Sequence, residues 1–365
     1  MFVVPCFGYG GLEQVLINIV RDLDRSRFTP SFCSLVEPEP DLYAELKGHD
    51  LACHVIEKGD GVKPSLPLKL SRLFRAERVD LVNAHDIGAT FYAAPAASLG
   101  RVPAFVHTDH SQILAKTKYP GVYRWIWKNL VDFSITVSED LEEHLVARYG
   151  VRPDRVCTIP NGIDTGRFAA GGRTAELRDE LGISAGDRVI GTIGRLMRQK
   201  GMPYLLEAFR ILHAGAPGTT LVIVGDGEER DGLEKLARES GIADKVIFAG
   251  IRRDIPDLLA MFDIFTLASL WEGQPITIME AMAAGRPIVA TDAGGTAEVL
   301  DSGRYGIIVP KEDPEALARS IRELLDDPAR AGRLGEEARI RAEAELSSAA
   351  MTKKYEEVFE SVYGG

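Results

Sequence analysis

Two glutamates at a predicted helix start are the residues of this sequence best suited to chemistry. The run 263–268 is apolar and β-branched, as in a strand covered on both faces, and Gly273 follows it. Apolar residues at helical spacing then predict a helix over 275–285. Glu272 lies just before that helix, and Glu280 lies about a turn and a half into it. The two carboxylates are therefore expected near one helix N-terminus.

A helix N-terminus has unpaired amides and a positive dipole, so it favours a phosphate or a sugar oxygen. Two carboxylates at such a place would add little if the ligand were only an anion. They fit a ligand with hydroxyl donors on both sides of its phosphates, because an ionised carboxylate accepts hydrogen bonds strongly. A nucleotide sugar has this chemistry. The candidate contacts at the helix start are Gly273, Gln274, Pro275 and Ile276.

Two cations after another predicted strand could meet the phosphates of such a ligand. The apolar run 188–193 ends at Gly194, and Arg195 and Lys200 frame the loop before the next helix. Each cation can form charge-assisted hydrogen bonds to a diphosphate, worth about 1.5–3 kcal/mol apiece. The alternative is an exposed basic loop.

These motifs resemble the donor site of family 4 of the retaining glycosyltransferases. The matching features are E-G-x-P from Glu272, E-A-M-A-A-G-x-P-I-V-A-T-x-x-G-G from Glu280, and G-R-L-x-x-x-K-G around Arg195 and Lys200. The resemblance implies that Glu272 orients the donor sugar and that Glu280 holds the ribose. It also implies that the backbone at Ile251 or its neighbour meets the nucleobase. Gln274 stands where many members have an aromatic residue, which leaves the identity of the sugar open.

The first half carries fewer candidates. Gly10 and Gly11 precede an amphipathic helix over 12–23, where glycines permit close approach of a phosphate, although a tight turn would need them too. His107 and His110 lie at the polar end of another predicted strand, 103–110, and His107 could simply satisfy a buried hydrogen bond. The resemblance implies that Gly10 and Gly11 face the donor phosphates and that His110 lies near the donor sugar and the acceptor.

Strands alternate with helices along the whole chain, which predicts an α/β protein with doubly wound parallel sheets. The resemblance implies the GT-B architecture, in which two Rossmann-like domains face a cleft. We expect an acceptor-side domain at 1–166, completed by a return helix at about 347–365. A nucleotide-sugar donor domain is expected at 167–346.

Composition excludes several classes of protein. The formal charge of -11 argues against nucleic acid as the main ligand, because duplex binding needs a field of Lys and Arg. No apolar run approaches the eighteen or so residues of a membrane span, and no secretory signal is recognisable, so we expect a cytoplasmic protein. The four cysteines, Cys6, Cys33, Cys53 and Cys157, lack metal-ligand spacing and are predicted to be buried free thiols.

An aromatic and basic segment at 114–131 suggests a second environment. Its tryptophans, Trp125 and Trp127, and its Lys and Arg residues suit a membrane interface with anionic lipid. Packing of both tryptophans in the core, with solvated cations, is the favoured alternative. Peripheral attachment to the inner face of a membrane therefore stays an open expectation.

The function expected is transfer of a sugar from a nucleotide diphosphate to a lipid-linked or saccharide acceptor, with Glu272, His110, Arg195 and Lys200 as the catalytic candidates. No metal or other cofactor is expected, because Asp22-Leu23-Asp24 imitates a metal-binding D-x-D but ends a helix. The rivals are a dinucleotide-dependent oxidoreductase or epimerase, a sugar-nucleotide-binding partner without turnover, and a phosphorylase. Gly225-x-Gly227 is weak support for the first, since Arg230 occupies the third glycine position.

Overall fold

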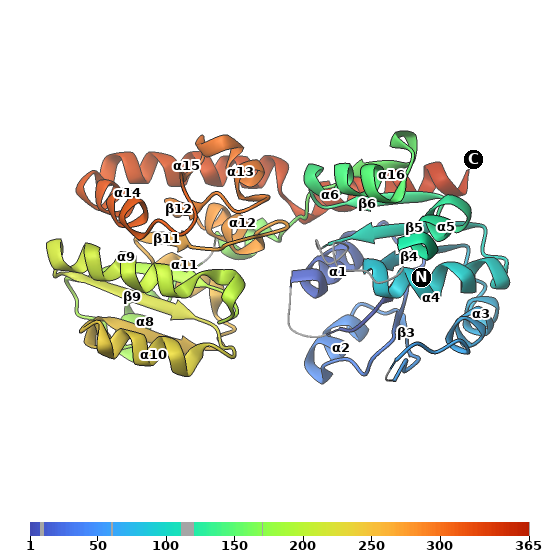
Figure 1. Ribbon diagram of the computed structural model, residues 1–365, viewed down its shortest axis with the longest axis horizontal. Coiled ribbons are helices and arrows are strands. Elements are labelled where there is room, and N and C mark those ends of the chain that lie inside the picture. Colours follow the sequence, from blue (N-terminus) through green and yellow to red (C-terminus); the bar gives the residue numbers. More distant parts are fainter. Residues whose placement is uncertain (8–10, 60, 111–119, 170, 365) are drawn as a thin grey trace. The chain divides into compact units, whose positions relative to one another are not determined.

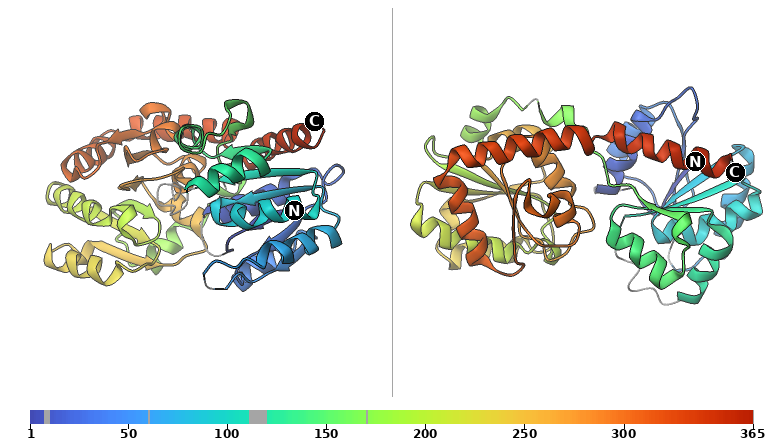
Figure 2. Two further views of the ribbon diagram at one scale, coloured as in Figure 1. Left: turned by 45° about the vertical axis from the view of Figure 1, so that its right-hand side comes forward. Right: turned by 90° about the horizontal axis from the view of Figure 1, so that it is seen from above.

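The computed structural model describes residues 1–365 except 8–10, 60, 111–119, 170 and 365, and it divides into two compact units. Unit 1 comprises Met1–Gly162 with Ser348–Gly365, and unit 2 comprises Ile163–Ser347. Each unit is a parallel sheet with helices on both faces (Figures 1 and 2). The prediction of doubly wound α/β units is confirmed, whereas the acceptor and donor roles of the two units stay predictions.

The sheet of unit 1 has the strand order β3-β2-β1-β4-β5-β6-β7. Its strands are β1 (Phe2–Val4), β2 (Ser31–Ser34), β3 (Ala52–Val55), β4 (Leu81–His85), β5 (Ala104–Asp109), β6 (Phe133–Thr136) and β7 (Val156–Thr158). Its helices are α1 (Gly11–Asp22), α2 (Pro40–Lys47), α3 (Leu66–Ala76), α4 (Asp86–Gly100), α5 (Pro120–Leu130), α6 (Glu139–His144), the π-helix η2 (Leu145–Tyr149), the 3₁₀ turn η3 (Pro153–Arg155) and α16 (Ser348–Tyr363). Chain order reverses between β1 and β4, so the switch point of this sheet lies there.

The sheet of unit 2 has the strand order β10-β9-β8-β11-β12-β13. Its strands are β8 (Arg188–Ile193), β9 (Thr219–Val224), β10 (Val246–Gly250), β11 (Ile264–Leu267), β12 (Ile288–Thr291) and β13 (Ile307–Val309). Its helices are α7 (Thr165–Phe168), α8 (Thr174–Glu180), α9 (Met202–Gly215), α10 (Arg230–Glu239), α11 (Ile255–Met261), α12 (Ile276–Ala283), α13 (Thr296–Val299), α14 (Pro314–Asp326) and α15 (Pro328–Glu345), with 3₁₀ turns η4 (Arg198–Lys200), η5 (Ala243–Lys245) and η6 (Asp301–Gly303). Here the switch point lies between β8 and β11.

Alternation along the central strands builds two apolar layers in unit 2. Ile264 packs with α9, α10 and α14 on one face, while Phe265 and Leu267 pack with α8, α11 and α12 on the other. Burial on both faces explains why these strands are continuously apolar. Capping residues favour the start of an outer helix such as α14. The Asp313 side chain accepts a hydrogen bond from the amide of Ala316, and a proline is the first residue of the helix.

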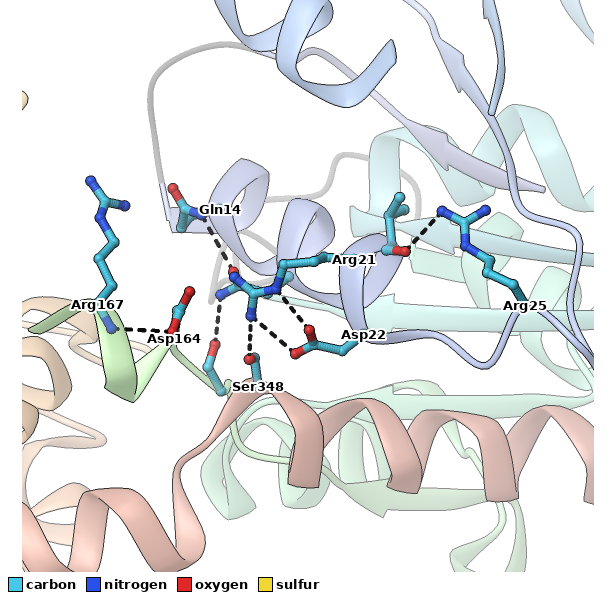
Figure 3. Close-up of polar contacts among 10 residues, drawn as sticks. Gln14, Arg21, Asp22, Arg25, Asp164, Arg167 and Ser348 are labelled. Carbon is cyan, nitrogen blue, oxygen red and sulfur yellow. Dashed lines mark hydrogen bonds and ion pairs between the residues drawn. The ribbon is translucent and has the colours of Figure 1, made fainter. Parts of the chain in front are cut away.

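The return helix α16 packs on unit 1 from the end of the chain. The Arg21 guanidinium on α1 donates to Ser348 Oγ at 2.6 Å while it also pairs with Asp22 (Figure 3). Farther along, the amide of Asp24 donates to Glu356 Oε1 at 2.7 Å. The D-x-D imitation, Asp22 and Asp24, is thus engaged in the contact between two helices.

The prediction that all four thiols are buried is wrong. Cys33, in a central strand, is buried, whereas Cys6 is exposed and Cys53 and Cys157 are half-buried. Cys6 lies beyond the last residue of β1, where the chain leaves the sheet. Cys53 and Cys157 belong to β3 and β7, the two edge strands of the sheet, where a neighbouring strand shields each residue on one side only. All four thiols are free.

Candidate functional site

A buried ion pair joins two of the predicted residues at the switch point of unit 2. Lys200 Nζ lies 2.6 Å from Glu272 Oε1, and the two side chains are 16% and 6% exposed. Lys200 belongs to the turn after β8, and Glu272 to the loop after β11. Because β8 and β11 are neighbours in the sheet, the loops that follow them meet. The sequence prediction placed these residues on separate motifs, and the structure brings them together.

Both carboxylate oxygens of Glu272 have protein donors. Ser269 Oγ donates to Oε1 at 2.5 Å, and Gln199 Nε2 donates to Oε2 at 3.3 Å. The same Gln199 amide donates to the carbonyl of Trp271 at 2.9 Å. A buried charge is tolerated when it is paired and hydrogen-bonded, and these contacts provide both. They also fix the direction of the carboxylate.

Two glycines let backbone loops press against the loop of Glu272. Gly294 has φ +58°, and a Cβ there would lie 2.1 Å from the carbonyl oxygen of Glu272. Gly201 has φ +59°, and a Cβ there would lie 2.1 Å from the carbonyl oxygen of Ala268. Any side chain at either position would push the Glu272 loop away. The glycines of the G-R-L-x-x-x-K-G and G-G motifs therefore position the glutamate.

Glu280 lies half-buried on α12, without a hydrogen bond to its carboxyl group from any residue that the structure describes. Burial raises the pKa of Glu280 to about 7, although the charge of Arg167 on α7 acts in the opposite direction. An acidic group kept partly desolvated and without a donor is poised to accept hydrogen bonds from a ligand.

The remaining candidates of unit 2 follow the carboxyl ends of β8, β10 and β11. Arg195 is exposed just after β8, and Ile251 is 75% exposed just after β10. Arg252, the alternative to Ile251, is held by Asp254 and Glu180, each at 2.6 Å. Gly273 and Gln274 precede α12. Pro275 is its N-cap residue and Ile276 begins the helix, one position later than predicted.

In unit 1, His110 follows β5 and belongs to a cluster that the sequence did not reveal. Its Nε2 lies 2.8 Å from Nδ1 of His85, and its backbone amide donates to Asp86 Oδ1 at 3.3 Å. Burial lowers the pKa of His110 to about 4, so its imidazole is neutral at physiological pH. Gly10 lies outside the described residues, and Gly11 opens α1.

His107, in contrast, is a structural residue. It is fully buried, its Nδ1 lies 2.7 Å from Thr90 Oγ1, and its ring meets that of Trp127 edge to face at 4.8 Å. Trp127 is buried with it, whereas Trp125 is 57% exposed. The expectation of core packing therefore holds for one of the two tryptophans.

Comparison with known proteins gives these sites a family. The profile described as "Glycosyl transferases group 1" matches residues 173–341, and that of "Glycosyltransferase Family 4" matches residues 9–167. The GDP-mannose-dependent alpha-(1-6)-phosphatidylinositol monomannoside mannosyltransferase of Mycolicibacterium smegmatis is 31% identical over 277 residues, covering 70% of this chain and 72% of the relative. The chain belongs to the group 1 glycosyl transferases.

Other relatives agree with this glycosyltransferase assignment. The UDP-Gal:alpha-D-GlcNAc-diphosphoundecaprenol alpha-1,3-galactosyltransferase of Escherichia coli is 28% identical over 270 residues, covering 71% of this chain and 70% of its own. Anabaena HepE, solved with UDP, superposes with a TM-score of 0.86 at 24% identity, covering 99% of this chain and 100% of HepE. WaaG, a glycosyltransferase involved in lipopolysaccharide biosynthesis, superposes with a TM-score of 0.72. The architecture is GT-B, as predicted.

Several residues of this glycosyltransferase escaped the sequence prediction. Ser269 and Gln199 hold Glu272, yet neither stands out among ordinary loop residues. Asn83 and His85 belong to β4 at the switch point of unit 1. Asp86 begins α4 directly after it, with φ +65°, which is rare outside glycine. The signal that could have identified them is the presence of polar residues near the end of a buried strand at a switch point.

Glu280→Gln should stabilise the protein at alkaline pH. The folded pKa of Glu280, about 7, lies above the ordinary value of 4.5, so folding disfavours its ionised form and stability falls as pH rises from about 4.5 through 7. At 1.36 kcal/mol per pKa unit, the amide should gain about 2–3 kcal/mol at pH 8 and under about 1 kcal/mol at pH 5. Urea unfolding at both pH values measures this.

The matched control for this measurement is Glu337→Gln, an exposed glutamate on α15. It should leave the unfolding free energy within about 0.5 kcal/mol at either pH. An equal gain for Glu280→Gln at pH 5 and pH 8 would contradict the assigned pKa.

Proposed function

We propose that this chain is a retaining glycosyltransferase that moves a sugar from a nucleotide diphosphate to an acceptor hydroxyl in the synthesis of a cell-surface polysaccharide or glycolipid. The observation that carries the proposal is the buried Lys200–Glu272 pair at the β8–β11 switch point, beside the start of α12. A cation, a carboxylate that accepts hydrogen bonds and the N-terminus of α12 lie at one sheet edge, and they match the groups of a nucleotide sugar.

The names of the relatives support this class of substrate. The two mentioned above are named for UDP-galactose and GDP-mannose, and their acceptors are a diphosphoundecaprenol-linked sugar and a phosphatidylinositol monomannoside. HepE has been solved with UDP and with UDP-glucose. For this chain we propose a nucleotide-diphosphate sugar and a lipid-linked or saccharide acceptor, with uracil and guanine both open.

Charge development explains why the site needs fixed cations. As the sugar departs, negative charge grows on the diphosphate while the anomeric carbon becomes cationic. Groups that bind this charge more strongly in the transition state than in the ground state accelerate the reaction. Lys200 is held in place by Glu272, and Arg195 projects from the same loop. We assign both to stabilising the diphosphate.

The two glutamates are assigned to hydroxyl groups. Glu272 would accept from the donor sugar, and Glu280 would accept from the ribose. With the sugar fixed in this way, the acceptor oxygen bonds to the anomeric carbon on the face from which the diphosphate leaves. The bond from that carbon to the diphosphate breaks, and the acceptor proton passes to the departing diphosphate oxygen, which gives retention without an assigned protein base. His110 remains the candidate in unit 1 for contact with substrate hydroxyls.

Nucleoside diphosphates should stabilise the enzyme, and NAD(H) should not. A ligand at 100 times its dissociation constant adds about 2.7 kcal/mol to stability, which a thermal scan with UDP, GDP and ADP detects. The matching sugar conjugate should then be hydrolysed slowly, and the sugar first released should keep the anomeric configuration of the donor by proton NMR. Inverted sugar would refute retention, and stabilisation by NAD(H) alone would favour an oxidoreductase.

Lys200→Ala should slow transfer more than it weakens donor binding. Leaving-group charge is larger in the transition state than in the donor, so we expect kcat to fall about a hundredfold and the donor Kd to rise less than tenfold. Steady-state assays measure kcat, and titration calorimetry measures the donor Kd. Arg198→Ala removes a neighbouring exposed cation of η4 and should change both less than threefold. Weaker donor binding with kcat unchanged would instead assign Lys200 to ground-state binding.

Chelators should leave turnover unchanged within about twofold. In the proposed mechanism Lys200, Arg195 and helix amides neutralise the diphosphate, which is the role of a divalent ion elsewhere. The D-x-D imitation is otherwise engaged, since Asp22 pairs with Arg21 at 2.7 Å and Asp24 accepts from Ser26 at 2.7 Å. Turnover assayed with EDTA, and again after addition of Mg²⁺, checks this. Loss with EDTA and recovery with Mg²⁺ would overturn it.

The exposed face of α5 is proposed to contact anionic lipid. Trp125 and Val122 are 57% and 46% exposed there, and Lys128, Arg152 and Arg155 line an adjoining cavity of about 500 Å³. No helix within the described ranges is long and apolar enough to cross a bilayer. An interfacial tryptophan beside cations instead fits headgroups at the surface of a bilayer.

Co-sedimentation with vesicles containing phosphatidylglycerol should therefore occur at low salt and disappear at about 0.5 M salt. Trp125→Ala should weaken it severalfold. Tyr363→Ala removes a comparably exposed ring, 56% accessible, from α16 and should have no effect. Equal binding to neutral vesicles, or none at low salt, would rule out this surface.

A further inference from the structure

The end of β4 contains a chain of hydrogen bonds that the proposed mechanism does not use. Asn83 Oδ1 lies 2.9 Å from Nε2 of His85, and His85 Nδ1 lies 2.8 Å from Nε2 of His110. Asn83 and His85 are buried to within 1% of full exclusion from solvent. A buried imidazole cannot turn to water, so its neighbours decide which ring nitrogen carries the proton.

The orientation of the Asn83 amide is fixed by its other partners. Its Nδ2 lies 3.3 Å from the backbone carbonyl of Val106 and 2.9 Å from Thr108 Oγ1. A carbonyl oxygen can only accept, so the nitrogen end of the amide must face Val106. The oxygen end of Asn83 therefore faces His85.

Proton positions then follow along the chain. Because Asn83 Oδ1 can only accept, His85 Nε2 must carry a hydrogen and donate it. His85 is neutral, since burial and the neighbouring histidines lower its pKa well below the ordinary value, so its Nδ1 is bare. A bare Nδ1 can only accept, so His110 Nε2 must donate. His110 is neutral too, which leaves its Nδ1 bare.

We propose that Asn83 and His85 are positioning residues that hold the His110 imidazole as its Nε2–H tautomer, so that His110 Nδ1 accepts a hydrogen bond from a substrate hydroxyl. The proposal rests on the assignment of His110 to the substrate site. No residue in the described ranges forms a hydrogen bond with His110 Nδ1. Because this nitrogen carries no proton, it can only accept a hydrogen bond, so its partner must be a donor. The ligand chemistry is thus a sugar or acceptor hydroxyl rather than a phosphate.

The backbone of His110 is held by the residue next to His85. Asp86 Oδ1 accepts from the His110 amide at 3.3 Å, with Asp86 itself in the left-handed region at φ +65°. Residues at the junction of β4 and α4 thus form hydrogen bonds with both the ring and the backbone amide of His110. The rings of His85 and His110 are nearly parallel, 13° apart, with centroids separated by 5.0 Å. His110 therefore has little freedom to rotate about its side-chain bonds.

The first test is spectroscopic and uses the full chain without substrate. In enzyme labelled with ¹⁵N-histidine, one slowly exchanging ring proton should show a one-bond coupling to His110 Nε2. It should also show a coupling through the hydrogen bond to the unprotonated Nδ1 of His85. Loss of the signal in His110→Asn assigns it. A proton bonded to His85 Nδ1, or no protected ring proton, would overturn the proposal.

The second test compares two nearly isosteric variants. In His85→Asn the amide oxygen replaces Nδ1 as an acceptor, whereas in His85→Leu a methyl group does. Loss of one buried hydrogen bond corresponds to about 10- to 100-fold. We expect kcat to fall by that factor in His85→Leu, with the donor KM changed less than threefold, and to recover to within about fivefold of wild type in His85→Asn. Equal kcat in the two variants would contradict the relay.

A buried histidine of the next strand provides the control. His107→Asn keeps an acceptor for Thr90 and has no hydrogen bond to His110, so it should lower stability but leave kcat within about threefold. If the enzyme proves to have no transferase activity, the coupling to His85 in the substrate-free protein still tests the tautomer assignment independently. Failure of the proposed function and failure of the tautomer assignment are therefore distinguishable, and the spectrum of the wild type decides even where a variant does not fold.

Discussion

The site in unit 2 depends on the ion pair between Lys200 and Glu272. Removing either partner would leave a charge in a place that water barely reaches, which costs several kcal/mol. The pair therefore needs both loops at fixed positions, and Ser269 and Gln199 supply further hydrogen bonds to the carboxylate. Gly201 and Gly294 remove the side chains that would separate these loops. Three loops therefore pack closely around this polar centre.

The reversal of strand order in each sheet is accompanied by a cluster of polar residues, charged in unit 2 and neutral in unit 1. In each sheet, chain order reverses between two central strands, and the loops beyond them diverge to leave room for side chains. In unit 2 the space holds paired charges. In unit 1 it holds imidazoles whose pKa values are lowered by burial, and hydrogen bonds and ring stacking order them. Paired charges in one sheet and neutral imidazoles in the other therefore occupy equivalent positions in the two topologies.

The sequence predicted much of this fold, because buried parallel strands are apolar runs and helices have distinct starts. The strand before Glu272 and the helix carrying Glu280 were both found from spacing. Contacts within the sites were less accessible. Lys200 and Glu272 meet only because β8 and β11 are neighbours, and strand order is not written in local periodicity. Asn83 and His85 were missed because a polar residue in a buried strand can be assigned to a hydrogen-bond network only when its partner is known. For His85 that partner is His110, 25 residues farther along the chain. Gly10 and Gly11 stay predictions, as do the assigned roles of all site residues.

The position of α16 has a consequence for synthesis on the ribosome. All seven strands of the first sheet are made before residue 160, yet the helix that covers Phe2 and Phe28 comes from residues 348–363. About half of the polypeptide must emerge between the sheet and its cover. During that interval Phe2 and Phe28 lack the ring that packs on them, and transiently exposed apolar surface of this kind favours aggregation. A nonsense codon late in the message, sparing every strand and every residue of the ion pair, would still leave the first unit incompletely folded.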